Sequence, residues 1–316
     1  MYEKRKEDSR HFLTAGQSSQ ICPSCDEFVA SIDRITLMAP LSLDAWESHF
    51  YEWLKLPFVE ISGTGLQVLD KSNCDFDDFG NRHDHVMPEQ VAFIEMARFQ
   101  KDKVRIDFNP NHGMESEGGL WLKELLNKLP RKTFSRADIA NDIFGHPEIA
   151  KYGVWNFGCS ERIFLDKNRV CETIYWGKSS SRQQIRLYNK KVEREARHGE
   201  IVNIDSWWRL EMQLRGDKVE DYPSLVKNML EHFYIPDFRS DNLTDNEQNK
   251  LARMMLDPFY YGQQSKKTQQ RLRQIIAKAK PDNSLSIQIA KNFVETLPSL
   301  ESELFGYLGR YHIDRK

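Results

Sequence analysis

The sequence has 316 residues, of which 40% are apolar and 11% aromatic, a composition that excludes global disorder and leaves room for one large domain or two ordinary ones. The formal net charge of −2 and the pI of about 6.5 exclude a uniformly basic surface. Any contact with nucleic acid must therefore come from local clusters of lysine and arginine.

Cysteine usage and the first residues bear on the compartment. The five cysteines are an odd number spread widely along the chain, which favours reduced thiols in a cytosol over a disulfide framework. The chain starts with charged residues that lead into no apolar run, so no secretory signal is expected. No stretch approaches the roughly 18 apolar residues of a membrane span. A cytoplasmic protein without membrane association is predicted.

The first half of the chain alternates between strand and helix patterns. After a polar leader over 1–27, the expected elements are a strand over 32–38, a helix over 42–54, a hairpin of 58–62 and 66–70, a helix from Pro88 that points Val91, Ile94 and Ala97 inward, a strand over 104–108 and a helix over 119–129. The intervening stretch 70–85 is rich in Asp and Asn and is expected to be a loop.

The second half changes from strands to helices. Strands are expected over 134–144, 161–166, 170–177, 184–190 and 206–215. Helices are expected after the capping box of Thr244 and Glu247, over 266–280 and over 284–297. This order favours an α+β fold with a mainly antiparallel central sheet and flanking helices, plus a C-terminal helical segment. The predicted divisions are a leader (1–27), a catalytic domain (28–240) and a helical C-terminal region (241–316).

Three of these strands combine an apolar face with a charged face. The period of two groups Arg186, Tyr188 and Lys190 on one strand, and Asp138 with Asp142 on another. The two aspartates share a face in a strand and in a helix alike, so they are expected to converge. Glu211 belongs to the polar parity of the third strand.

This set of residues suits phosphoryl transfer. A phenol is a weak nucleophile until a cation or metal stabilises the phenolate, and Lys190 and Arg186 supply positive charge that also grips a phosphate. Asp138, Asp142 and Glu211 are oxygen ligands of the kind that a hard divalent ion prefers. Other readings stay open, because a strand tyrosine is commonly a packing residue and paired aspartates are commonly solvated or salt-bridged.

Three segments, FSRADIANDIFG, TIYWGKSSSRQQIRLYNKKVER and WWRLEMQLR, occur in the order typical of one family. Together they resemble the replication initiators of staphylococcal-type rolling-circle plasmids, a family that also includes relaxases of some integrative conjugative elements. The resemblance covers about 133–215. The chain departs from the family pattern at Ala137, where a larger apolar residue is common, and at Asn141.

The resemblance implies a function and its residues. Tyr188, in the Tyr-Asn-Lys motif, corresponds to the nucleophile that nicks and rejoins DNA at an origin through a 5′-phosphotyrosyl intermediate and a free 3′-hydroxyl. Lys190 is the lysine of that motif. Asp138, Asp142 and Glu211 occupy the acidic positions, with Mg²⁺ or Mn²⁺ as the implied ion. The result would be a metal-dependent, topoisomerase-like strand transferase.

The resemblance also implies partners. Family members act as homodimers, recognise an inverted repeat in the plasmid origin and the single strand exposed there, and cooperate with a host replicative helicase. Residues 258–281 contain no Asp or Glu, and with the resemblance their basic residues are predicted to contact DNA: Lys266, Lys267, Arg271, Arg273, Lys278 and Lys280. Two alternatives remain, a conjugative relaxase at a transfer origin and a non-catalytic DNA-binding repressor.

Three further signals receive less weight. Cys22 and Cys25 form a lone CxxC without a second ligand pair, and His83 with His85 falls in the loop. Trp208 has the parity of the core, whereas Trp207 shares the polar parity and is a candidate for stacking on an unpaired base.

Overall fold

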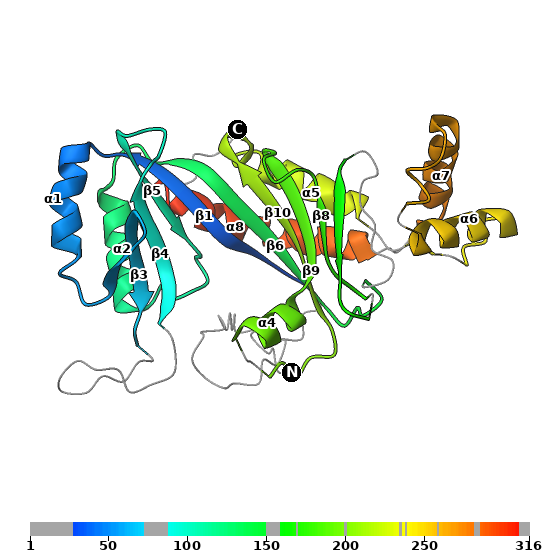
Figure 1. Ribbon diagram of the computed structural model, residues 1–316, viewed down its shortest axis with the longest axis horizontal. Helices are drawn as coiled ribbons and strands as arrows, with labels where there is room; N and C mark the ends of the chain where they lie inside the picture. Colours follow the sequence, from blue (N-terminus) through cyan, green and yellow to red (C-terminus); the bar gives the residue numbers. More distant parts are fainter. Residues whose placement is uncertain are drawn as a thin grey trace, which may run out of the picture. The chain divides into compact units, whose positions relative to one another are not determined.

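The computed structural model describes residues 28–72, 88–149, 159–168, 170–198, 201–233, 236–237, 239–257, 259–280 and 285–309. The chain forms two compact units (Figure 1). Of the described residues, unit 1 contains 33–133 and unit 2 contains 28–32 and 134–309. The predicted leader, Cys22, Cys25, His83 and His85 lie outside the described residues.

Unit 1 consists of an antiparallel sheet and two described helices. Its strands, in hydrogen-bonding order, are β2 (Val59–Ser62), β3 (Gly65–Asp70), β4 (Glu89–Met96), β5 (Lys103–Phe108) and β1 (Phe28–Pro40), whose first residues belong to unit 2. Its helices are α1 (Leu43–Trp53) and α2 (Glu117–Lys128). The hydroxyls of Ser42 and Ser116 accept backbone N–H groups at the two helix starts, which explains where each helix begins.

Helix α2 covers the β3–β4 part of this sheet. Its first turn approaches the sheet so closely that a Cβ atom on Gly118 would lie 2.8 Å from the carbonyl oxygen of Leu69. Glycine at this position therefore allows the helix to pack on the strand. The strands beneath are filled by fully buried side chains, including Leu66, Ile94 and Ile106.

Unit 2 contains a second antiparallel arrangement of strands. In hydrogen-bonding order they are β6 (Thr133–Phe144), β10 (Trp207–Arg215), β9 (Gln183–Asn189), β8 (Cys171–Trp176) and β7 (Glu161–Leu165). Its helical elements are α4 (Lys190–His198), η1 (Gly216–Lys218), α5 (Tyr222–His232), α6 (Asp245–Leu256), α7 (Lys266–Lys278) and α8 (Leu285–Gly306). The observed elements confirm the predicted α+β class with antiparallel sheet and flanking helices.

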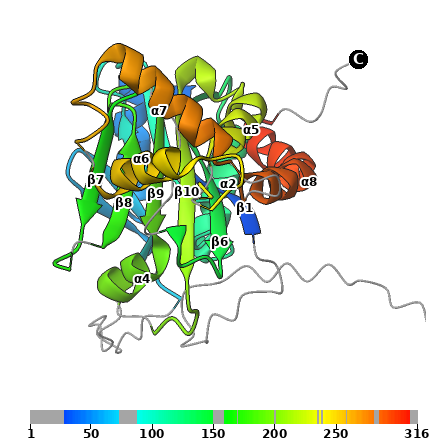
Figure 2. The ribbon, with the colours of Figure 1, turned by 90° about the vertical axis from the view of Figure 1, so that its right-hand side faces the viewer.

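The apolar face of the unit 2 strands is covered by helices. Helix α5 packs against β10 and against α8, and Figure 2 shows α5 and α8 next to each other. Leu187, Leu210 and Ile139 are fully buried on this face. Because side chains alternate along a strand, the polar residues between them project to the opposite face.

Helices α6 and α7 share a small core of their own (Figure 2). Leu251 from α6 and Leu272 and Ile276 from α7 are buried in it, with Tyr260 and Tyr261 packed alongside. The capping box of Thr244 and Glu247 is confirmed at the start of α6. The Thr244 hydroxyl accepts the backbone N–H of Glu247, and the Glu247 carboxylate accepts the backbone N–H of Thr244. Among the described helices, none combines the length and the apolar character that a membrane span requires.

One predicted element is wrong. The segment after Pro88 was expected to be a helix, but Glu89–Met96 is strand β4, paired with β3 and β5. The strand lies between two neighbours and buries residues on both faces, among them Val91, Ala92 and Ile94. Burial on both faces removes the alternation that identifies a strand in a sequence, and the spacing of the remaining apolar residues then imitates a helix.

Other differences concern the helices of unit 2. Helices α4 and α5 were not predicted, and α8 continues through Pro298 to Gly306 instead of ending at 297. The predicted boundary at 240 does not coincide with the edge of a compact unit, because α8 packs on α5 within unit 2. The division into a leader, a catalytic domain and a C-terminal region therefore remains a prediction.

Candidate active site on the sheet of unit 2

The polar face of the unit 2 strands carries all six residues of one site. We call it the tyrosine face, and it consists of Asp138 and Asp142 on β6, Arg186 and Tyr188 on β9, and Arg209 and Glu211 on β10. The strand register places Arg209 between Asp142 and Tyr188, and Glu211 opposite Arg186. Directly opposed residues on one sheet face are close enough for their side chains to interact. The register thus brings together residues that are far apart in the sequence.

Tyr188 lies beneath two cations. The guanidinium carbon of Arg186 is 4.1 Å from the centre of the phenol ring, and the ammonium nitrogen of Lys190 is 5.6 Å from it. Both distances are within the range of a cation–π interaction. Tyr188 is only 5% exposed, so its ring is held by its surroundings rather than projecting freely. Two positive charges therefore lie next to the phenol ring.

Arg186 joins the tyrosine to a carboxylate. One of its terminal nitrogens donates to Glu211 at 2.7 Å, and Glu211 is 4% exposed. Burial opposes the charge on Arg186, but Glu211, Tyr188 and Tyr175 outweigh it and hold the pKa of the guanidinium above its usual range. Among the described residues, the buried Nε of Arg186 has no hydrogen-bond partner. This donor beside the tyrosine is the kind of group that a phosphoryl oxygen satisfies.

Lys190 reaches the tyrosine from a helix. It was expected on the same strand as Tyr188, but β9 ends at Asn189 and Lys190 is the first residue of α4. The Asn189 side chain accepts the backbone N–H of Val192 and so caps this helix. The Lys190 ammonium also pairs with Glu193 at 2.6 Å. In the Tyr-Asn-Lys motif, the asparagine therefore turns the chain and places the lysine back over the ring.

Asp142 is bound by three donors. The Nε and Nη2 atoms of Arg209 donate to its two carboxylate oxygens at 2.8 and 2.7 Å, and the indole N–H of Trp207 donates at 2.7 Å. Trp207 is 5% exposed, which contradicts its expected role as a stacking platform for an unpaired base. Trp208 lies in the core as predicted, with an exposure of 2%. Trp207 and Arg209 were not recognised from the sequence, although their shared parity with Glu211 places them on this face.

The carboxylates do not fit one metal site. Asp138 and Asp142 are both on β6, and four residues of strand separate their backbones by about 13 Å. The two carboxylates therefore do not converge on one ion, contrary to expectation, because each oxygen ligand must lie within about 2.6 Å of the bound ion. Asp138 is bound by Arg136, Asp142 by Arg209 and Glu211 by Arg186. Among the described residues, no group of three His, Cys, Asp or Glu side chains is placed to hold a metal ion.

The basic residues predicted to contact DNA lie on or just after α7. Three of them have partners within the protein: Arg273 donates to the Tyr261 hydroxyl, Lys278 pairs with Glu247, and Lys280 donates to the Glu231 carbonyl. The other three, Lys266, Lys267 and Arg271, are exposed and have no ion pair within the described part of the chain.

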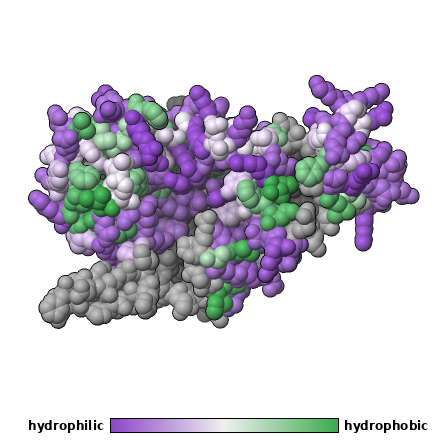
Figure 3. Space-filling model, in the orientation of Figure 1, coloured by the Kyte–Doolittle hydropathy of each residue, from purple (hydrophilic) through white to green (hydrophobic). Residues whose placement is uncertain are grey.

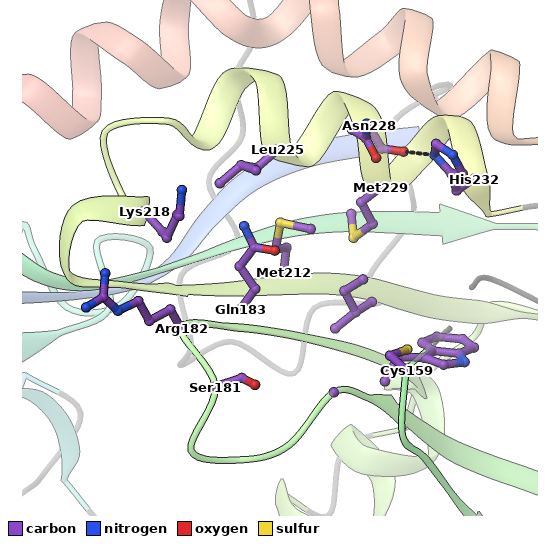
Figure 4. A pocket seen from close by; sticks show the side chains of 13 residues that line it. Cys159, Ser181, Arg182, Gln183, Met212, Lys218, Leu225, Asn228, Met229 and His232 are labelled. Carbon is purple, nitrogen blue, oxygen red and sulfur yellow. Dashed lines mark hydrogen bonds between the residues drawn. The ribbon is translucent and has the colours of Figure 1, made fainter. Parts of the chain in front are cut away.

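A pocket of about 560 Å³ lies on the opposite face of the same strands (Figure 4). Ile185 and Met212, which form its floor, have the parity opposite to Tyr188 and Glu211. Its rim includes Arg182, whose guanidinium is held by Asp217. The pocket is therefore separate from the tyrosine face, and burial raises the pKa of its Cys159 thiol, which keeps that thiol protonated.

Residues 148–234 match the family model described as "Replication initiation factor". The matched segment includes Arg186, Tyr188, Lys190, Arg209 and Glu211, and it begins after both aspartates of β6.

Several curated relatives have the same description. A "Replication initiation protein" of Staphylococcus aureus is 26% identical over 194 residues, which are 60% of this chain and 60% of the relative. A second from the same organism is 26% identical over 222 residues, 68% of each chain. The chain thus spans about 60% of the length of the first of these relatives.

A solved structure is similar at lower identity. It is the rolling circle replication initiator protein from Geobacillus stearothermophilus, 16% identical, with 72% of this chain and 97% of that chain covered at a TM-score of 0.36. At that score the likeness does not establish a shared arrangement. The match over 148–234 includes the tyrosine strand. That segment of the chain is therefore similar to the replication initiation factor family, and the chain as a whole is similar to the staphylococcal replication initiation proteins.

Proposed function

We propose that this protein nicks and rejoins one DNA strand at a plasmid origin and so initiates rolling-circle replication. Its staphylococcal relatives are described as replication initiation proteins, and the family match contains Tyr188. The observation that carries the chemistry is the position of Tyr188 beneath Arg186, whose buried Nε is unpaired. A phosphate bound there would meet the nucleophile and a charged donor at once.

The proposed reaction is a transesterification. The phenol oxygen of Tyr188 attacks the phosphorus, a P–O bond to the tyrosine forms, and the bond to the 3′-oxygen breaks. The phenol loses one proton and the leaving 3′-oxygen gains one, so protons and phosphodiester bonds both balance. The same atoms in reverse rejoin the strand. Arg186 and Lys190 stabilise the phenolate before attack and the extra negative charge on the phosphate during it.

Several parts of the proposal rest on the resemblance alone. Dependence on Mg²⁺ or Mn²⁺ stays a prediction, and no step above uses an ion because the described carboxylates are bound by arginines. A homodimer, a host replicative helicase and an inverted repeat in the origin also remain predictions. The exposed Lys266, Lys267 and Arg271 of α7 are proposed to contact the phosphates of the origin duplex.

The test uses a supercoiled plasmid that carries the coding region and its flanking DNA. Wild-type protein with Mg²⁺ is expected to relax it and to form a covalent adduct with an oligonucleotide of the flanking DNA labelled at its 3′ end, because the fragment on the 3′ side of the nick stays on the tyrosine. Tyr188→Phe should bind the plasmid but give neither product. Tyr175→Phe is the matched control. Tyr175 is on β8 opposite Arg186, and its substitution removes a nearby phenol hydroxyl while the hydroxyl of Tyr188 stays in place.

Two outcomes would overturn the proposal. If wild-type protein binds this DNA and leaves it supercoiled, the protein is a non-catalytic repressor. If Tyr188→Phe still forms the labelled adduct while Tyr175→Phe does not, the nucleophile is Tyr175.

A further inference from the structure

The turn between β4 and β5 exposes one aromatic side chain completely. Phe99 is 98% exposed, more than any other large hydrophobic residue in the described parts of the chain. Hydrophobic residues on the face shown in Figure 3 form separate patches within a largely hydrophilic surface. Single exposed apolar side chains are common on protein surfaces, so the way the turn is held and the charges around Phe99 decide what this ring could bind.

The turn is held by backbone hydrogen bonds. The N–H of Ala97 donates to the carbonyl of Lys103 at 2.9 Å, and the N–H of Lys103 donates to Gln100 at 2.9 Å. The N–H of Leu41, just after β1, donates to Asp102 at 2.9 Å and anchors the turn from the side. Phe99 therefore projects from a fixed turn and not from a loose loop.

Positive charge surrounds the phenyl ring. Arg98, Lys101 and Lys103 flank Phe99, and none of them has an ion pair within the described structure. Asp102 is the one acidic residue between Ala97 and Lys103. The exposed aromatic of α1 has the opposite setting, because Tyr51, 68% exposed, is flanked by Glu47 and Glu52.

We propose that residues 97–103, the Phe99 wedge, insert the Phe99 ring between stacked bases of DNA and open the duplex locally. This proposal rests on the proposed function and extends it from strand cleavage to strand opening. Proteins that kink DNA insert a single apolar side chain between base steps while adjacent cations hold the phosphates. A lone ring among cations matches that arrangement, whereas a protein or membrane interface needs a larger apolar patch.

Strand opening supplies what the cleavage needs. Attack by a tyrosine requires a phosphodiester that can leave the regular duplex path, and a stacked base pair resists that movement. A ring inserted at one step compensates part of the lost stacking, because an aromatic side chain stacks on any base.

The experiment measures opening without cleavage. An A·T-rich duplex oligonucleotide with an internal 2-aminopurine reports unstacking as a rise in fluorescence. Wild-type protein and Phe99→Trp should raise the fluorescence. Phe99→Ala should need a protein concentration at least about ten times higher than wild type to reach the same fluorescence. Tyr51→Ala is the control for loss of an exposed aromatic in the same unit and should behave as wild type.

A second measurement separates this proposal from the nuclease proposal. Phe99→Ala should nick a single-stranded oligonucleotide of the flanking DNA at the wild-type rate and nick the duplex about ten times more slowly. Equal losses on both substrates, or an unchanged fluorescence response, would overturn the wedge. If wild-type protein nicks neither substrate, the proposed function fails, and the fluorescence response of Phe99→Ala still decides the wedge.

Discussion

Asp142 is a buried carboxylate of the tyrosine face that accepts hydrogen bonds from two residues of β10. It is 6% exposed and receives donors from Arg209 and Trp207. Asp142→Ala removes the carboxylate that accepts from a buried guanidinium and from an indole N–H, so we expect a loss of about 3–5 kcal/mol in the free energy of unfolding. Urea denaturation measures this loss. Asp217→Ala breaks an exposed pair with Arg182 and should cost about 0–1 kcal/mol. Similar costs for both variants would contradict the buried network.

Tyr222, the first residue of α5, has a buried hydroxyl group. Its side chain is fully buried, and its hydroxyl oxygen has no hydrogen bond to any described residue. An unsatisfied buried polar group is destabilising, so we expect Tyr222→Phe to raise the free energy of unfolding by about 1 kcal/mol at neutral pH. Chemical denaturation of the two proteins tests this, and a loss of stability in Tyr222→Phe would indicate a partner for the hydroxyl.

The same residue predicts a pH dependence. Burial, together with Glu301 and Glu303, raises the pKa of Tyr222 far above its usual range. In the unfolded chain the phenol loses its proton near about pH 10, whereas in the folded protein it stays protonated. The unfolded state then binds fewer protons, so stability falls as the pH rises above about 10. Tyr222→Phe should show a smaller decline over this range in denaturation curves.

At the scale of single residues, the sequence grouped Tyr188 with Arg186, but it did not predict which residues pair with Asp142 and Glu211. Alternation along one strand placed Tyr188 with Arg186, and this holds in the structure. The partners of Asp142 and Glu211 come from other strands, so they depend on a register that no local pattern contains. This is why the aspartates were expected to converge.

At the scale of elements, α7 is a helix with one buried and one cationic face. Lys266, Lys267 and Arg271 are exposed, whereas Leu272, Ile275 and Ile276 fill the small core shared with α6. If these three cations each neutralise one phosphate, replacing all three with alanine should reduce the slope of log affinity against log salt by about 2.7. Binding to plasmid DNA at several salt concentrations measures the slope.

A matched substitution makes that test specific. Lys278 has the same charge and lies on the same helix, but its ammonium is 2.7 Å from Glu247. Lys278→Ala should therefore change this slope by less than the loss of one phosphate contact would, which is about 0.9. If Lys278→Ala has the larger effect, DNA contacts the other end of α7.

Local signals determined how well each element was predicted. Helices with a serine or threonine cap, such as α6 and α7, start where the sequence indicates. Strand β4 was mistaken for a helix because both its faces are buried, and α4 was missed because its cap, Asn189, belongs to a motif read as strand. The pattern failed where tertiary burial, not local chemistry, decides the conformation.

For the whole molecule, charge and chemistry are distributed unevenly. The chain has a net charge of −2, yet α7 and the Phe99 wedge each present unpaired cations in the described structure. The whole tyrosine face lies in unit 2, and the wedge lies in unit 1. Composition predicted that any DNA contact must be local, and it had no means of indicating a division near residue 133, which depends on contacts distant in the sequence.

The alternation of β9 has an evolutionary consequence. Tyr188 and Arg186 face the polar side while Leu187 and Ile185 fill the core, so the proposed nucleophile and the core residues alternate along one strand. Losing the phenol hydroxyl removes no core packing, and a lineage can thus exchange a nuclease for a DNA-binding protein in one step without an unfolded intermediate. An insertion of one residue within β9 would be destabilising, because a register shift by one residue would turn the apolar side chains to the polar face and the charged side chains into the core.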